Sequence, residues 1–82
     1  MYQQFCGIDV SKDSFDITLL ESSGEIKLQD KLTMDREGFN ALLKHLSSYP
    51  KEKLLVAMEA TGIYHLPLLS FLLENSFKSV VV

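Results

Sequence analysis

A chain of 82 residues has room for one small domain with a modest hydrophobic core. The composition, 46% hydrophobic and 23% charged, is that of a globular protein. The net charge of −3 argues against the basic face typical of nucleic-acid-binding domains. Contacts with DNA or RNA would therefore need a local basic patch or metal ions. The single cysteine, Cys6, excludes an internal disulfide, and without a long apolar run or a signal sequence we expect a cytoplasmic protein with no membrane segment.

The N-terminal part of the chain predicts an antiparallel meander. Residues 5–10 are mostly apolar or small and favour β-structure, which is typical of a strand with both faces covered, and Asp9 lies near the end of this run. Polar residues 11–14 predict a turn, and residues 15–20 a returning strand. Apolar and polar side chains then alternate over residues 26–32, which predicts a third, half-buried strand.

Two helices and two further strands are predicted in the rest of the chain. Asp35 is a plausible N-cap for a helix whose apolar stripe runs to Leu46. Residues 54–58 are apolar without alternation, which predicts a strand buried on both faces and ending at Glu59. A second helix is predicted from about Leu66, followed by a strand in residues 77–82.

The predicted element order is therefore β-β-β-α-β-α-β, and we expect the sheet order 3-2-1-4-5. With right-handed crossovers, both helices fall on the same face of this sheet. The other face would be bare, to be covered by a later helix or by a neighbouring molecule. The first and fourth strands would run parallel as neighbours, about 4.8 Å apart, so that Asp9 and Glu59 leave the same edge of the sheet.

Two carboxylates without a histidine or cysteine cluster suit Mg²⁺ or Mn²⁺ better than Zn²⁺. Paired ions of this kind cleave and transfer phosphodiesters, which predicts catalytic and metal-binding roles for Asp9, as the central ligand, and for Glu59. Two carboxylates are too few for a pair of ions. We therefore expect two ions only in a complete domain with further acids, and no activity from residues 1–82 alone.

Two hexapeptides, GIDVSK at residues 7–12 and EATGIY at residues 59–64, carry a resemblance to a known family. They resemble the N-terminal part of the IS-one-ten (IS110-like) transposases, a group that includes the Piv-type DNA invertases. The resemblance implies a RuvC-like, ribonuclease-H-type α/β catalytic domain with a D-E-D-D set of acids, of which Asp9 and Glu59 match the first two. It further implies that residues 1–82 are the N-terminal part of one catalytic domain, truncated after the fifth strand, with the other acids and a second domain beyond Val82.

The same resemblance implies a partner and a reaction. The substrate would be insertion-element DNA, cleaved and transferred, with an element-encoded guide RNA in some members. We expect a homo-oligomer at full length. Candidate contacts to nucleic acid are Ser11, Lys12, Thr61 and Tyr64, although a solvated turn, a helix cap and ordinary packing are alternatives for them.

Other roles remain open for the same residues. Asp13 and Asp16 suit solvated or hairpin-pairing positions better than metal binding. Actin-like and sugar-kinase ATPases also open with a strand, an aspartate and a hairpin, but their turn normally has a glycine where Ser11 stands. A non-catalytic assembly module, in which both acids merely face solvent, is the second alternative.

Overall fold

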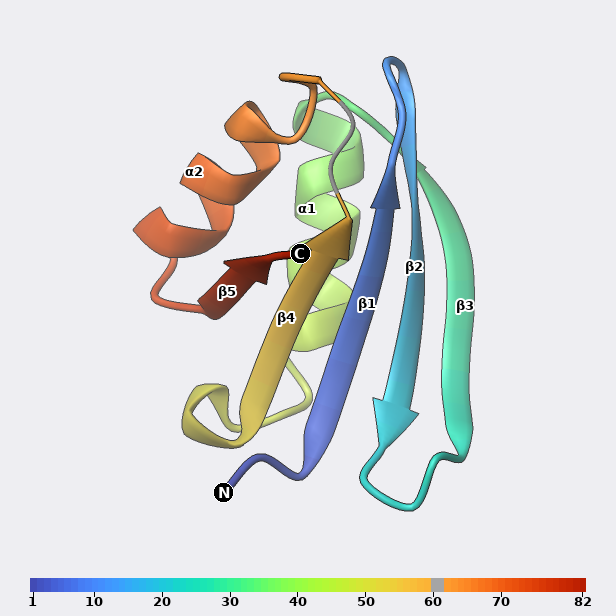
Figure 1. Cartoon of the computed structure of the whole chain (residues 1–82), viewed down its shortest axis with the longest axis vertical. Helices are drawn as coiled ribbons and strands as arrows, with labels where there is room; N and C mark the ends of the chain where they lie inside the picture. The colour runs from blue at the N-terminus through green and yellow to red at the C-terminus, as the bar shows by residue number, and fades with distance from the viewer. Residues whose placement is uncertain (60–61) are drawn as a thin grey trace.

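One mixed sheet organises the computed structural model, which describes residues 1–59 and 62–82 (Figure 1). A short 3-10 helix, Lys51–Lys53, leads into the fourth strand. The strands are β1 (Gln4–Val10), β2 (Ser14–Glu21), β3 (Ile26–Thr33), β4 (Leu54–Glu59) and β5 (Lys78–Val81), and the helices are α1 (Arg36–Leu46) and α2 (Leu66–Glu74).

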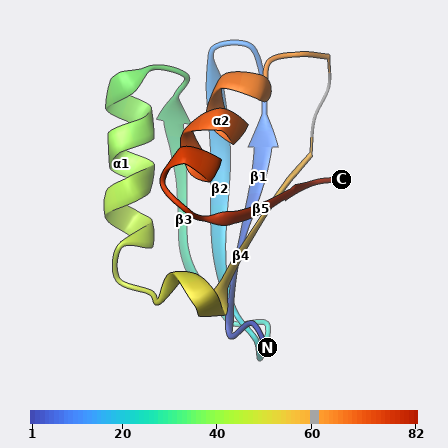
Figure 2. The ribbon, with the colours of Figure 1, turned by 90° about the vertical axis from the view of Figure 1, so that its left-hand side faces the viewer.

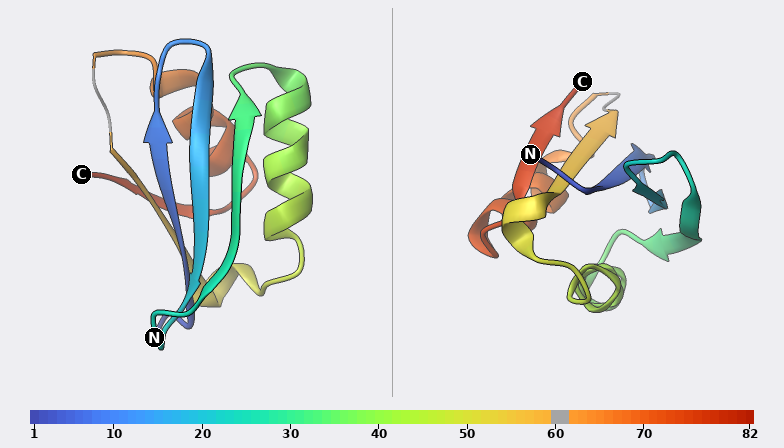
Figure 3. Two further views of the ribbon diagram at one scale, coloured as in Figure 1. Left: turned by 90° about the vertical axis from the view of Figure 1, so that its right-hand side faces the viewer. Right: turned by 90° about the horizontal axis from the view of Figure 1, so that it is seen from below.

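The strand order is β3-β2-β1-β4-β5, which confirms the predicted topology. The strand pairs β1–β2 and β2–β3 are antiparallel, whereas β1–β4 and β4–β5 are parallel. Figures 2 and 3 show α1 and α2 on the same side of the sheet. The fold is therefore the expected α/β ribonuclease-H-like arrangement, and among the described residues no helix covers the opposite face, which we call the open face.

Within the described residues the helices cover only one face of β1 and β4, as the predicted sheet order requires. Their core-facing residues alternate with residues that point to the open face, where Asp9 and Glu59 are exposed and Phe5, Leu55 and Ala57 are half-buried. Apolar residues on the open face make the sequence run look continuous, although only one side meets the helices. The buried partners are Cys6, Ile8, Val10, Leu54, Val56 and Met58.

Three phenylalanines join the sheet to both helices. The ring of Phe39 in α1 lies 6.0 Å from that of Phe15 in β2 and 5.1 Å from that of Phe71 in α2, measured between centroids. Tilted aromatic pairs at these separations pack favourably. Phe39 therefore fills the corner where α1, α2 and the sheet meet.

The predicted start of the first helix is confirmed. Asp35 is the N-cap of α1, and its Oδ1 accepts hydrogen bonds from the Thr33 hydroxyl at 2.6 Å and from the Gly38 amide at 2.9 Å. These two bonds, with the Thr33 hydroxyl first, hold the pKa of the Asp35 carboxyl below its usual value. In α2, Pro67 sits in the first turn, where its missing amide costs nothing.

None of the helices in residues 1–59 and 62–82 is long and apolar enough to cross a membrane.

Cys6 lies fully buried in β1, and burial raises the pKa of its thiol to about 12. The folded protein therefore favours the protonated thiol, so this contribution to stability is complete below pH 9.0 and is lost as the pH rises toward about 12. We expect iodoacetamide at pH 8 to modify Cys6 only after denaturant is added, as followed by mass spectrometry. A Cys6→Ala variant should lose less stability between pH 9 and 12, and rapid modification of the native protein would contradict the burial.

Candidate active site

Asp9 and Glu59 are direct partners in the parallel pairing of β1 with β4. Paired residues on neighbouring strands point to the same face, and the strands lie about 4.8 Å apart. Both side chains are exposed on the open face, at the end of the sheet where β1 and β4 finish. The two acids are therefore brought side by side, as the sequence predicts.

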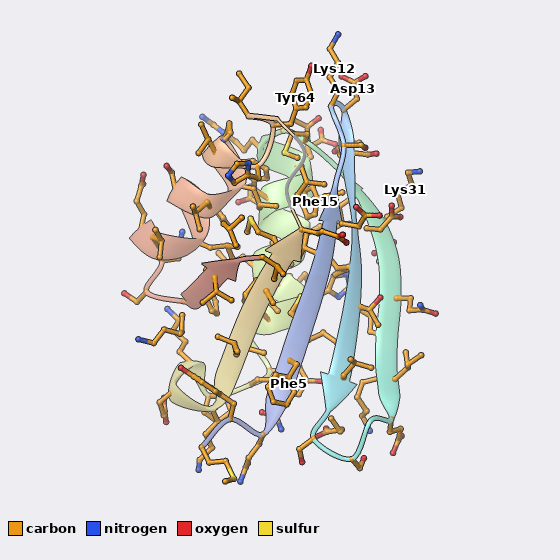
Figure 4. All side chains as sticks on the ribbon, viewed as in Figure 1. Phe5, Lys12, Asp13, Phe15, Lys31 and Tyr64 are labelled. Atoms are coloured by element: carbon orange, nitrogen blue, oxygen red, sulfur yellow. The ribbon has the colours of Figure 1, made fainter. Side chains whose placement is uncertain are left out.

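A third acid stands beside them. Asp16 of β2 is the antiparallel partner of Asp9, and Lys31 of β3 is the partner of Asp16. One row across the open face thus runs from Glu59 through Asp9 and Asp16 to Lys31, and Figure 4 shows Lys31 extending from the β3 edge. We call Glu59, Asp9 and Asp16 the acidic row.

The sequence predicts a hairpin-pairing role for Asp16 but misses its place in the acidic row. The signal was present in the short turn over residues 11–14. A turn of that length pairs Val10 with Phe15, and the next pair outward on the same hairpin is Asp9 with Asp16.

The acidic row borders a shallow hollow of about 640 Å³ on the open face. Its floor is formed by three small residues, each two positions from an acid of the row on the same strand: Gly7, Thr18 and Ala57. Because Gly7 has no side chain, the hollow reaches the backbone of β1 directly beside Asp9. An extended ligand lying across the open face would meet the carboxylates and this floor together.

No acid of the row forms an ion pair in the described part of the chain, although Lys31 stands opposite Asp16 on β3. The ion pairs there join Lys27 to Glu25 at 3.6 Å and His45 to Asp30 at 3.1 Å, and neither involves the row. Like charges on directly opposed residues are destabilising in a sheet. A cation bound between the carboxylates would remove that repulsion.

The donor chemistry of the row fits a hard divalent cation. Carboxylate oxygens are the ligands that Mg²⁺ and Mn²⁺ prefer. Within residues 1–59 and 62–82, however, no three His, Cys, Asp or Glu side chains are arranged around one metal position. The acids of the row are therefore oxygen donors of the right kind that do not surround a cation by themselves.

Of the remaining predicted site residues, Ser11, Lys12 and Tyr64 lie near the same end of the molecule. Ser11 uses its hydroxyl within the hairpin turn, 3.0 Å from the Ser14 carbonyl oxygen, which favours the structural alternative. Lys12 is exposed at the hairpin tip, and Tyr64, 45% exposed, precedes α2 at that end (Figure 4). Thr61 lies outside the described residues.

The fold and the paired acids define an α/β protein of the ribonuclease-H-like class with a carboxylate site at the carboxyl ends of β1 and β4. The family model of IS110-type DEDD transposases, described as transposase, matches residues 6–82. The chain therefore belongs to this transposase family. No curated protein matches the chain.

Solved structures share the fold at low identity. A Bacteroides thetaiotaomicron protein with an actin-like ATPase fold and unknown function has a TM-score of 0.79 and 17% identity, over 98% of this chain and 32% of that one. Archaeoglobus fulgidus Pelota has a TM-score of 0.62 and 21% identity, over 100% of this chain and 26% of that one. The Aquifex aeolicus PPX-GPPA enzyme has a TM-score of 0.50 and 12% identity, over 98% of this chain and 36% of that one.

These likenesses concern the fold alone. The chain spans between about a quarter and about a third of the length of each of these structures. The likeness to an actin-like ATPase fold therefore supplies no evidence for ATP binding, and the family match is to transposases.

Proposed function

We propose that this chain is the N-terminal part of a transposase catalytic domain that cleaves and transfers insertion-element DNA in a metal-dependent reaction. Asp9 and Glu59 are the catalytic, metal-binding acids of this proposal. The observation that carries it is the direct pairing of Asp9 with Glu59 in a member of a DEDD transposase family. The remaining acids of the set would come from beyond residue 82.

Mg²⁺ or Mn²⁺ is the cofactor that fits the carboxylates, with two ions in the complete domain. Bound at such a site, divalent cations stabilise charge on the attacking and leaving oxygens of a phosphodiester. The chain's own contribution is position. Asp9 lies on the central strand between Glu59 and Asp16, and ladder pairing on both sides of β1 fixes the face from which its side chain leaves the sheet.

DNA is the proposed substrate, with an element-encoded guide RNA as a further partner and a homo-oligomer as the full-length state. Lys12 and Tyr64 are the best supported nucleic-acid contacts, because both are exposed at the end of the molecule that carries the acids. Lysine would contact a phosphate, and tyrosine could stack on a base. Ser11 and Thr61 belong to the same proposal.

The cation dependence of DNA cleavage by the full-length transposase tests this function. We expect cleavage of element-end DNA in Mg²⁺ or Mn²⁺, loss of cleavage in EDTA, and recovery when the cation is returned. Residues 1–82, checked for folding by circular dichroism, should not cleave because their acid set is incomplete. Cleavage that persists in EDTA would refute the metal-dependent reaction, and protection of the full-length protein by ATP against thermal unfolding would favour the ATPase alternative.

A further inference from the structure

Gly7 occupies a position where the fold itself does not need a glycine. It lies in the middle of β1, the central strand, and faces the open side between Ala57 of β4 and Thr18 of β2. A Cβ added at Gly7 would meet no atom within 4 Å, and the backbone there is not in the left-handed region. An alanine would therefore fit without strain.

A glycine inside a strand weakens it, since the unfolded chain gains freedom and no side chain packs. Such glycines usually mark a bulge, a sharp bend or the close approach of a ligand or another backbone. The pairing of β1 runs without interruption on both sides of Gly7, so no bulge explains it. Close approach from the open face is the explanation that we pursue.

The place of Gly7 indicates what approaches. Gly7 lies two residues before Asp9 on the same face, about 7 Å along the strand, and lines the hollow that the acidic row borders. An apolar protein segment packed here would desolvate three carboxylates that form no ion pair within the described residues. A phosphodiester accompanied by divalent cations would match those carboxylates and leave its neutral sugar over the floor.

We propose that Gly7 is a positioning residue for the DNA strand, keeping the floor of the hollow open for the sugar next to the phosphate held at Asp9 and Glu59. This inference rests on the proposed function. A side chain at position 7 would lift the sugar–phosphate away from the carboxylates without touching the carboxylates themselves. Misplacement of a reacting group by about 1 Å can cost roughly 100-fold in rate.

The test compares Gly7→Ala and Gly7→Val with Gln29→Val in the full-length transposase. Gln29 is exposed and does not line the hollow. It pairs with Thr18, the β2 partner of Gly7, so Gln29→Val controls for adding a β-branched side chain to the open face. We expect Mn²⁺ affinity, measured by calorimetry without DNA, to stay within about twofold in all three variants, since Asp9 and Glu59 are untouched. Cleavage should fall by roughly 100-fold in Gly7→Val, less in Gly7→Ala and not at all in Gln29→Val.

Each other outcome overturns the inference. Normal cleavage by Gly7→Val would show that nothing needs the open floor. A melting temperature lowered by Gly7→Val but not by Gln29→Val would show that another part of the protein occupies the hollow. A different result would refute the proposed function itself: cleavage by Asp9→Asn at the wild-type rate.

Discussion

Full-length transposase carrying Asp9→Asn or Glu59→Gln is expected to lose DNA strand cleavage by roughly 10²–10³-fold. Each substitution keeps the size and shape of the side chain, removes its negative charge and replaces one acceptor oxygen by an NH2 donor. Asp9 and Glu59 are direct partners on β1 and β4, so under the proposed function either substitution would leave the cation with one carboxylate of this pair. Cleavage rates under single-turnover conditions, with Mg²⁺ well above its dissociation constant, measure the effect.

Stability should move in the opposite direction from activity. Asp9 opposes an acid on each side, Glu59 and Asp16, and like charges directly opposed across a sheet are destabilising. Asp9→Asn should therefore unfold at a denaturant concentration equal to or higher than wild type. Asp13→Asn, which neutralises an exposed acid at the hairpin tip outside the row, is the matched control and should retain cleavage. Full activity of Asp9→Asn would support the assembly-module alternative.

The topology was predictable because few arrangements were open to the chain. Short turns favour a meander for the first three strands, which leaves the outer edge of the first strand free for the fourth, and right-handed crossovers then put both helices on one face. The local signals were equally direct. Asp35 marks the start of α1, and the apolar run before Glu59 ends where β4 ends.

The surroundings of the strands were less predictable. An apolar run reports that its side chains avoid water but not which neighbour covers them, so the open face of β1 and β4 could not be read from their composition. The acidic row depends on register, which joins Asp16 to Asp9 across the hairpin. Sequence spacing alone put Asp16 in a returning strand, and only the pairing put it beside the site.

Gly38→Ala is expected to lower the free energy of unfolding, because the space for a side chain at this position is already filled by backbone. Gly38 is buried in the first turn of α1, against the strand end that leads into the helix. A Cβ there would lie 2.6 Å from the Thr33 carbonyl carbon and closer still to its oxygen. Those atoms belong to backbone, which cannot turn aside as a side chain can, so α1 must move away from β3.

The sign of the change in the free energy of unfolding on Gly38→Ala distinguishes the effect of packing from that of helix propensity. Propensity alone would favour alanine over glycine by about 1 kcal/mol. Overpacking a tight contact typically costs about 1–3 kcal/mol, and here the clash also disturbs the hydrogen bond from the Gly38 amide to Asp35. We expect a net loss in the free energy of unfolding by urea titration, whereas Asn40→Ala, at an exposed position of the same helix, should be neutral or stabilising.

Comparing Gly38→Ala with Asp9→Asn separates a loss of folding from a loss of catalytic chemistry. Gly38 and Thr33 lie at the junction of β3 and α1, whereas the acid pair lies on β1 and β4, so Gly38→Ala should lower cleavage only in proportion to the unfolded fraction. Cooling or a stabilising osmolyte should then restore the activity of Gly38→Ala but not that of Asp9→Asn. A Gly38→Ala protein as stable as wild type would mean that α1 does not pack this closely on Thr33.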